Sequence, residues 1–182
     1  MKSITLKRLV CASLCMALGF ALPFLTGQIP EIGAKLSAMH IAVFLCGFLC
    51  GWKYGLLIGF VTPLLRSLLL TMPPMYPNAL AMALELGCYG FLSGLLYRLF
   101  PKKIPYLYLS LALAMLGGRL VWGLARFVML LVGKTDFSLS LFLSAAFLDG
   151  IPGILLHFTL VPPTVIALKK AGLFFQKGRP SP

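Results

Sequence analysis

The chain has 182 residues, of which 60% are hydrophobic and only 11% charged, and its mean hydropathy is +0.98. A soluble domain carries about 25% charged residues, so the composition excludes an ordinary soluble domain. The net charge of +12 does not indicate nucleic-acid binding, because the basic residues lie at the ends of apolar runs and form no patch with interspersed aromatic residues. We expect an all-α integral membrane protein, a single domain over residues 1–182, without a nucleic-acid partner.

Six transmembrane helices are predicted from apolar runs close to the ~20 residues that span a bilayer. Their approximate bounds are 6–26, 38–51, 54–71, 78–99, 105–132 and 141–168. The second run is short, which also allows a re-entrant segment. The first follows basic residues, as in a signal peptide, but it lacks a convincing cleavage site, so we expect a retained helix.

Basic residues are concentrated at one set of predicted helix ends. They are Lys2, Lys7, Arg8, Lys53, Arg98, Lys102, Lys103, Lys169, Lys170, Lys177 and Arg179. The opposite loops hold Lys35 and Lys134. By the positive-inside rule both termini are cytoplasmic. The asymmetry favours six spans, since a re-entrant second helix would break the alternation.

All five cysteines lie within apolar runs: Cys11, Cys15, Cys46, Cys50 and Cys88. The first two and the next two are spaced i, i+4, which places each pair on one helix face. The sequence contains no CxxC motif and no histidine close to them. We interpret them as buried, reduced thiols and expect no metal site.

Five charged residues fall inside the predicted spans: Arg66, Glu85, Arg119, Arg126 and Asp149. A charge at the bilayer centre costs roughly 2.5–3.5 kcal/mol on insertion scales, so it usually faces a partner or a wet cavity. At about 1.5 Å of rise per residue, all but Arg119 lie about 8–12 Å below the outer helix ends. Arg119 is predicted to lie deeper.

A proline-rich turn, MPPMYP, separates Arg66 from Glu85. Proline lacks the backbone N–H and restricts the preceding residue, so this turn cannot be helical throughout. Trp122 shares a helix face with Arg119 and Arg126, and His40 and Asn78 lie at the outer rim. We predict that the hairpin forms one wall of a binding cavity.

Two interpretations of the intramembrane charges remain open. In the first, buried ion pairs such as Arg66–Glu85 and Arg126–Asp149 only fix helix packing. In the second, an outward-facing polar pocket holds three arginines against two carboxylates, and an anionic solute completes the balance, because arginine suits bidentate carboxylate binding. The candidate substrate-binding residues are Arg66, Asn78, Glu85, Arg119, Trp122, Arg126, Asp149 and His40. His157 is interpreted as a core histidine.

Catalytic and nucleotide-binding motifs are mostly absent from the sequence. Gly133-Lys134-Thr135 resembles the end of a P-loop, but Val128 stands where the pattern needs glycine. HExxH, GxSxG and aspartate clusters are also missing. We expect no catalytic residues, no enzyme activity and no cofactor bound by this chain, and ATP-driven work would need other subunits.

Ser13, Ala17 and Ala21 recur every four residues on the first predicted helix, a small-xxx-small spacing that allows close helix approach in lipid. Three features resemble those of a known family. They are the chain's size, this small-residue spacing, and the runs AMHIAVFLCGFLCGWKYGLLIGFVTPLLRSLL and MPPMYPNALAMALELGCYGFLSGLLYRL. The sequence is similar to the substrate-binding S components of energy-coupling factor (ECF) vitamin transporters.

The resemblance implies capture of a water-soluble vitamin in an outward pocket gated by loops 27–37, 72–77 and 133–140. It implies docking through the Ala17-xxx-Ala21 face onto a transmembrane coupling subunit in a prokaryotic plasma membrane. Two cytoplasmic ATPase subunits would hydrolyse ATP and drive toppling of the S component in the lipid. Family members share little pocket sequence, so no ligand residue transfers from the resemblance.

A net-positive pocket favours an anionic vitamin such as pantothenate or a folate. Two other function classes remain. A small membrane enzyme would need a nucleophile, an acid–base pair or a metal cluster, none of which we find. A stand-alone secondary carrier or a membrane scaffold is the main alternative, and inverted repeats, which would favour a carrier, are not seen.

Overall fold

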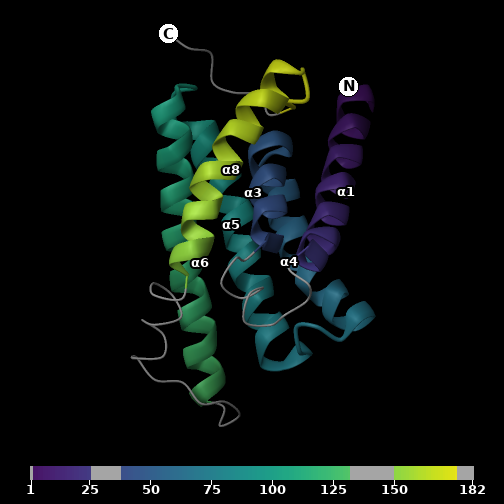
Figure 1. Ribbon diagram of the computed structural model, residues 1–182, viewed down its shortest axis with the longest axis vertical. Helices are drawn as coiled ribbons and strands as arrows, with labels where there is room; N and C mark the ends of the chain where they lie inside the picture. Colours follow the sequence, from purple (N-terminus) through teal and green to yellow (C-terminus); the bar gives the residue numbers. More distant parts are fainter. Residues whose placement is uncertain (1, 26–37, 132–149, 176–182) are drawn as a thin grey trace.

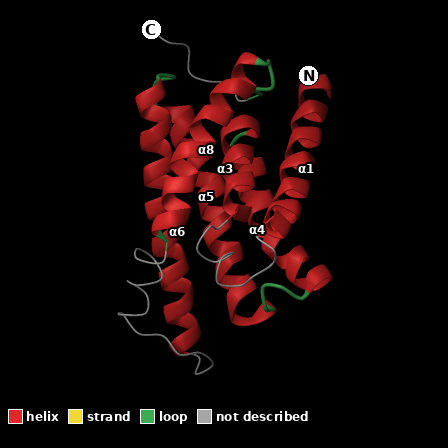
Figure 2. Cartoon of the chain, viewed as in Figure 1, coloured by secondary structure: helices red, strands yellow, loops and turns green. Residues whose placement is uncertain are grey.

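The computed structural model describes residues 2–25, 38–131 and 150–175 (Figure 1). Within these ranges the regular structure is helical throughout (Figure 2). The helices are α1 (Lys2–Leu25), α3 (Ala38–Cys50), α4 (Trp52–Leu70), α5 (Leu80–Leu99), α6 (Ile104–Leu131) and α8 (Ile151–Lys170), and a π-helical turn η1 (Met75–Ala79) precedes α5. The predicted all-helical class is confirmed, and the predicted start of the last helix lies outside the described residues.

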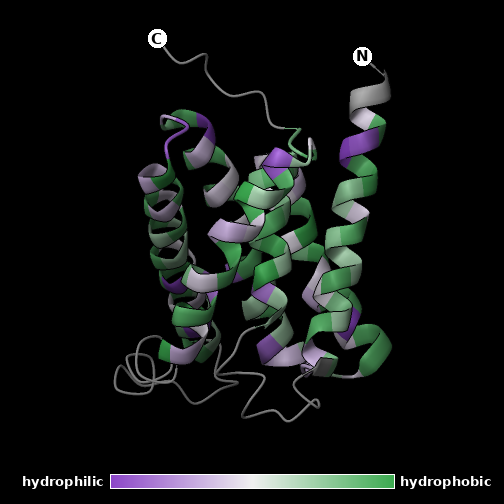
Figure 3. Ribbon diagram, turned by 45° about the horizontal axis from the view of Figure 1, so that its top comes forward, coloured by the Kyte–Doolittle hydropathy of each residue, from purple (hydrophilic) through white to green (hydrophobic). Residues whose placement is uncertain are grey.

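Five helices in the described part of the chain are long and apolar enough to cross a membrane. The exception is α3, which has 13 residues, or about 20 Å at the usual helical rise. Hydrophobic residues make up much of the helical ribbon (Figure 3), and Leu57, Leu69, Leu120 and Leu124 are each more than half exposed. This exposed apolar surface is the one expected of helices that face lipid.

The start of α1 and the end of α8 lie at the same end of the bundle (Figure 1). Phe175, just after α8, joins them: its N–H donates to the Leu49 carbonyl at 3.1 Å, and its carbonyl accepts from Arg8 Nε at 3.0 Å. Two cavities at this end are lined by Arg8, Lys53, Arg98, Lys102, Lys103, Lys169 and Lys170. We term this the basic end.

Glycine and proline end the central helices. Gly51 separates α3 from α4 with φ of 102°, a left-handed conformation that glycine adopts without a Cβ clash. The proline-rich turn separates α4 from α5, and Tyr76 within it has non-helical φ and ψ of −117° and 134°. The predicted interruption of helical structure in this turn is confirmed.

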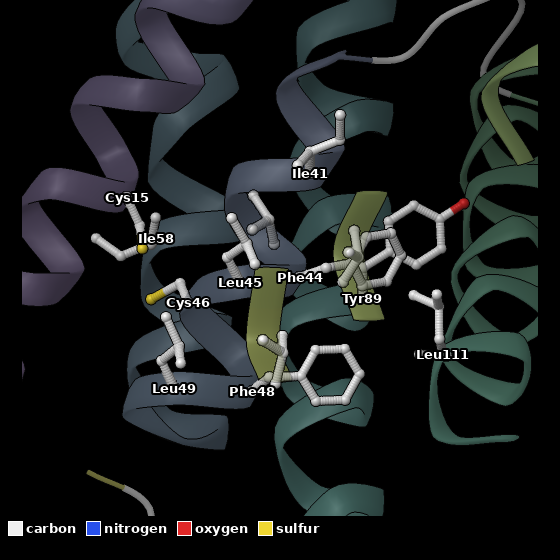
Figure 4. Close-up of a cluster of buried hydrophobic side chains, with 14 of the residues drawn as sticks. Cys15, Ile41, Phe44, Leu45, Cys46, Phe48, Leu49, Ile58, Tyr89 and Leu111 are labelled. Carbon is white, nitrogen blue, oxygen red and sulfur yellow. The ribbon is translucent and has the colours of Figure 1, made fainter. Parts of the chain in front are cut away.

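Helix α3 forms the centre of the bundle. Its residues from Met39 to Cys50 are all buried, and it packs against α1, α4, α5 and α8. Phe44 and Phe48 belong to the hydrophobic core around it (Figure 4). A polar residue on α3, such as His40, therefore lies inside the protein and away from lipid.

Four glycines, Gly47, Gly55, Gly59 and Gly90, form a contact between α3, α4 and α5, which we term the glycine contact. A Cβ at any of them would come closer than 3.0 Å to backbone atoms of a neighbouring helix. Small residues of this kind let helix backbones approach closely where lipid surrounds the bundle. The glycine contact sets the spacing of the helices that carry His40 and Glu85.

Helix α1 packs on α3 through cysteines. The thiol of Cys15 lies near that of Cys46, and the thiol of Cys11 near that of Cys50, across the two helices, and the thiols of each i, i+4 pair also interact along their own helix. Figure 4 shows Cys15 and Cys46 in the buried cluster. We term these four residues the thiol ladder. All five cysteines are free; Cys15, Cys46 and Cys50 are buried as predicted, whereas Cys11 and Cys88 are only half-buried.

Candidate functional site

A buried carboxylate, Glu85 on α5, lies at the centre of a polar cluster. Its side chain is 2% exposed. Its Oε1 accepts a hydrogen bond from the Tyr89 hydroxyl at 2.7 Å and lies 3.0 Å from Nη1 of Arg119 on α6. Its Oε2 lies 3.9 Å from Nε2 of His40 on α3. We term these four residues the Glu85 cluster, and it draws together three helices.

Local sequence explains how the cluster forms. Tyr89 follows Glu85 by four residues and therefore shares its helix face. On α6, Gly118 precedes Arg119, and a Cβ at Gly118 would come closer than 3.0 Å to the Tyr89 ring. The glycine thus lets the α6 backbone approach the tyrosine, which brings the Arg119 guanidinium within reach of the carboxylate.

Aromatic rings surround the cluster on the side of α3 and α8. The Tyr89 ring centre lies 5.4 Å from that of His40 and 5.0 Å from that of Phe44. His157 on α8 is 3% exposed, and its ring lies 5.8 Å from His40 and 5.5 Å from Phe44. His157 is therefore a buried residue, as interpreted from the sequence, and it also adjoins the Glu85 cluster.

A second polar pair lies nearer the end of the bundle opposite the basic end. The Asn78 Oδ1 accepts a hydrogen bond from Arg126 Nη1 at 3.3 Å, and the Arg126 guanidinium lies 5.9 Å from the Trp122 ring. Seven residues separate Asn78 from Glu85 and Arg119 from Arg126, which is about 10 Å along each helix. We term Asn78 and Arg126 the outer pair.

Arg66 faces a different neighbour from the one predicted. It is 4% exposed, its Nη1 donates to the Phe20 carbonyl on α1 at 2.8 Å, and its guanidinium lies 5.4 Å from the Phe24 ring. The Arg66–Glu85 ion pair, which one of the two open interpretations contained, is therefore wrong, because Arg66 projects from α4 toward α1. Arg119, predicted to lie deeper than Glu85, is the arginine that pairs with it.

The Glu85 cluster and the outer pair differ in net charge. Among the described residues Glu85 is the sole carboxylate side chain, and Arg119 balances it. Arg126 has no carboxylate within ion-pair distance in the described part of the chain, and its Nε has no hydrogen-bond partner there. Asp149 and the predicted gates 27–37 and 133–140 lie outside the described residues, so the Arg126–Asp149 pair stays a prediction.

This arrangement suits binding of an anion more than catalysis or metal binding. In the described ranges, no group of three or more His, Cys, Asp or Glu side chains could hold a metal ion. The outer pair offers a guanidinium, an amide and a nearby indole ring. Guanidinium binds carboxylates bidentately, and an aromatic face packs against an apolar or planar group.

Small residues form a second feature of functional interest, on α1. Ser13, Ala17 and Ala21 are exposed, whereas Ala12 and Cys15 on the same helix are buried. The small-residue face therefore points away from the bundle. It is available for close packing with another helix in the membrane.

A family model described as ECF transporter, substrate-specific component, matches residues 7–165. The chain belongs to this family. Comparisons with curated proteins and with solved structures found no match. The family role confirms the predicted class: the S component is a multi-pass membrane protein, the substrate-specific subunit of a transporter, and not an enzyme.

Family membership also implies a small-molecule substrate and association with a coupling subunit and ATPases. The matched range contains the Glu85 cluster, the outer pair and the small-residue face of α1. Sequence reasoning about this S component did not single out Tyr89 or Phe44. A signal was present for Tyr89, since it lies one turn after an intramembrane carboxylate, whereas Phe44 looks like any other apolar residue of a buried helix.

Proposed function

We propose that this S component binds an anionic water-soluble vitamin or related micronutrient, such as pantothenate or a folate, on the outer side of a prokaryotic plasma membrane. The outer pair carries the proposal, because Arg126 has no carboxylate partner in the described part of the chain. A guanidinium without a carboxylate partner among the described residues favours an anionic ligand, since a charge in the bilayer usually faces a partner or a wet cavity.

The two polar groups divide the work of recognition in this proposal. Arg126 binds the carboxylate of the solute, Asn78 offers an amide, and Trp122 packs against the solute's apolar part. The Glu85 cluster forms the floor, where the Glu85–Arg119 pair and His40 provide acceptor and donor groups for the solute's hydroxyl or amide groups. A neutral, hydrogen-bonded floor below a cation selects for one negative charge at the outer end.

Transport in this proposal requires partner subunits. The S component has six spans with both termini in the cytoplasm, which the basic end supports through the positive-inside rule. The Ser13, Ala17 and Ala21 face docks on a transmembrane coupling subunit. The sequence of this chain has no complete nucleotide-binding motif, so ATP hydrolysis is assigned to two cytoplasmic ATPase subunits. Hydrolysis by these subunits drives release of the vitamin inside the cell.

A thermal-shift screen of the purified protein against water-soluble vitamins tests the binding step. A ligand that binds only the folded state stabilises it by about 2.7 kcal/mol at a hundredfold excess over Kd. We expect an anionic vitamin to raise the melting temperature, Arg126→Ala to abolish the shift, and Arg98→Ala, which removes an exposed arginine at the basic end, to retain it. A full shift in Arg126→Ala would refute this assignment.

A transport assay with the reconstituted complex tests the docking step. Ala17→Trp should block ATP-dependent uptake and leave the vitamin's thermal shift intact, because the indole would obstruct close helix packing. Leu18→Trp is the matched control, since Leu18 is also exposed but lies about 100° around the helix. Normal uptake by Ala17→Trp would show that this face does not dock.

A further inference from the structure

A cavity at the basic end, between α5, α6 and α8, is separate from the candidate substrate site. Its volume is about 340 Å³, and Lys102, Lys103, Lys169 and Lys170 line it. No acidic residue contributes to the lining. We term it the lysine cavity. Four ammonium groups around one cavity repel one another, so the site favours an anion.

Two of the lysines are held close together by aromatic rings. Lys102 Nζ donates a hydrogen bond to the Tyr97 carbonyl and lies 3.8 Å from the Tyr97 ring centre and 5.8 Å from that of Phe174. Lys169 Nζ lies 5.9 Å from the same Phe174 ring. Burial and the neighbouring Lys169 lower the pKa of Lys102 to about 8. A bound anion would relieve this repulsion.

The other wall of the lysine cavity is apolar and leads toward the lipid-facing surface. Leu107 on α6 and Val165 on α8 are buried in it, and Ile104 at the start of α6 is 59% exposed. A free inorganic anion would gain nothing from such a wall. A lipid would, because its charged head and apolar chain meet at the same depth where lysines lie above apolar residues.

We propose that the lysine cavity binds an anionic phospholipid, with the headgroup phosphate between Lys102 and Lys169 and an acyl chain along the apolar wall formed by α6 and α8. Basic cavities between transmembrane helices at the cytoplasmic side suit such headgroups. The inference is independent of the vitamin proposed for the outer site, because it uses a different end of the bundle.

Thermal unfolding in a neutral detergent, with added lipid, tests this proposal. We expect phosphatidylglycerol to raise the melting temperature, and phosphatidylcholine or inorganic phosphate at equal concentration to leave it unchanged. The variant Lys102→Gln/Lys169→Gln should bind phosphatidylglycerol about 30-fold more weakly, since each lysine near an anionic lipid contributes about a fivefold gain. The control Lys7→Gln/Lys53→Gln removes two exposed lysines outside the lysine cavity and should bind normally.

Three outcomes would overturn the proposal. An equal loss in both double variants would show general attraction to the basic end, and an equal shift with inorganic phosphate would show a site for the free anion. The third outcome comes from a chemical modification experiment on the unmutated protein. Because its pKa is lowered, Lys102 is neutral more often than an ordinary lysine at the same pH, so acetic anhydride should acetylate it faster, and phosphatidylglycerol should slow that reaction. Unchanged acetylation would exclude a headgroup at Lys102.

Discussion

Replacing Glu85 with glutamine keeps the side chain's shape but removes the charge that balances Arg119. The two groups are 3.0 Å apart, and their side chains are 2% and 18% exposed. At an effective dielectric constant near 20 their attraction is about 5–6 kcal/mol, and breaking a buried pair costs about 3–5 kcal/mol in measured cases. For a protein of this size that corresponds to a melting temperature lower by about 6–20 °C.

The assay is thermal unfolding in detergent, followed with a thiol-reactive fluorophore that labels the buried cysteines as they become exposed. A double-mutant cycle with Arg119→Gln measures the interaction energy between Glu85 and Arg119 apart from the contacts that each side chain makes with other residues. We expect each single variant to be strongly destabilised and Glu85→Gln/Arg119→Gln to be less destabilised than the sum, because it leaves no unpaired charge. A Glu85→Gln protein that melts within about 2 °C of the wild type, or strictly additive effects, would refute the reasoning.

Two further predictions test the packing. Gly118→Ala should lower the melting temperature because its methyl group would collide with the Tyr89 ring. Gly117→Ala should have a small effect, because the atom that its methyl group would crowd is the flexible end of the Leu92 side chain. Equal melting temperatures would contradict the described approach of α6. In a variant retaining only Cys15 and Cys46, a mild oxidant should form a disulfide within one chain, detected as fragments that stay joined after cleavage between α1 and α3, and failure to crosslink would contradict the thiol ladder.

The helices were largely predictable because the length of each apolar run, and the proline or glycine residues that interrupt it, can be read from the sequence. Predicted 54–71 is observed as α4 (Trp52–Leu70), and predicted 105–132 as α6 (Ile104–Leu131). Successive described helices also run in alternating directions through the bundle (Figure 1). What composition could not fix was the role of α3, since a short apolar run fits both a central helix and a re-entrant segment.

Several of the polar residues singled out from the sequence lie together in the structure, but their pairings were harder to predict, and their role in substrate binding stays a prediction. Depth along a helix follows from residue count, but the direction of a side chain around the helix depends on which neighbours the helix packs against. Arg66 and Glu85 share a predicted depth, yet Arg66 projects toward α1 and contacts Phe20. Asn78 and Glu85 are seven residues apart, and so are Arg119 and Arg126. On two neighbouring antiparallel helices this equal spacing places Asn78 beside Arg126 and Glu85 beside Arg119, as observed.

The glycine contact has a consequence for how the protein can move. Where the backbones of α3, α4 and α5 touch without intervening side chains, one helix cannot slide past another without lifting out of its groove. These three helices should therefore behave as a rigid body during the transport cycle. Access to the site must change either through displacement of α1, α6 or α8 around that body, or through reorientation of the whole bundle in the bilayer.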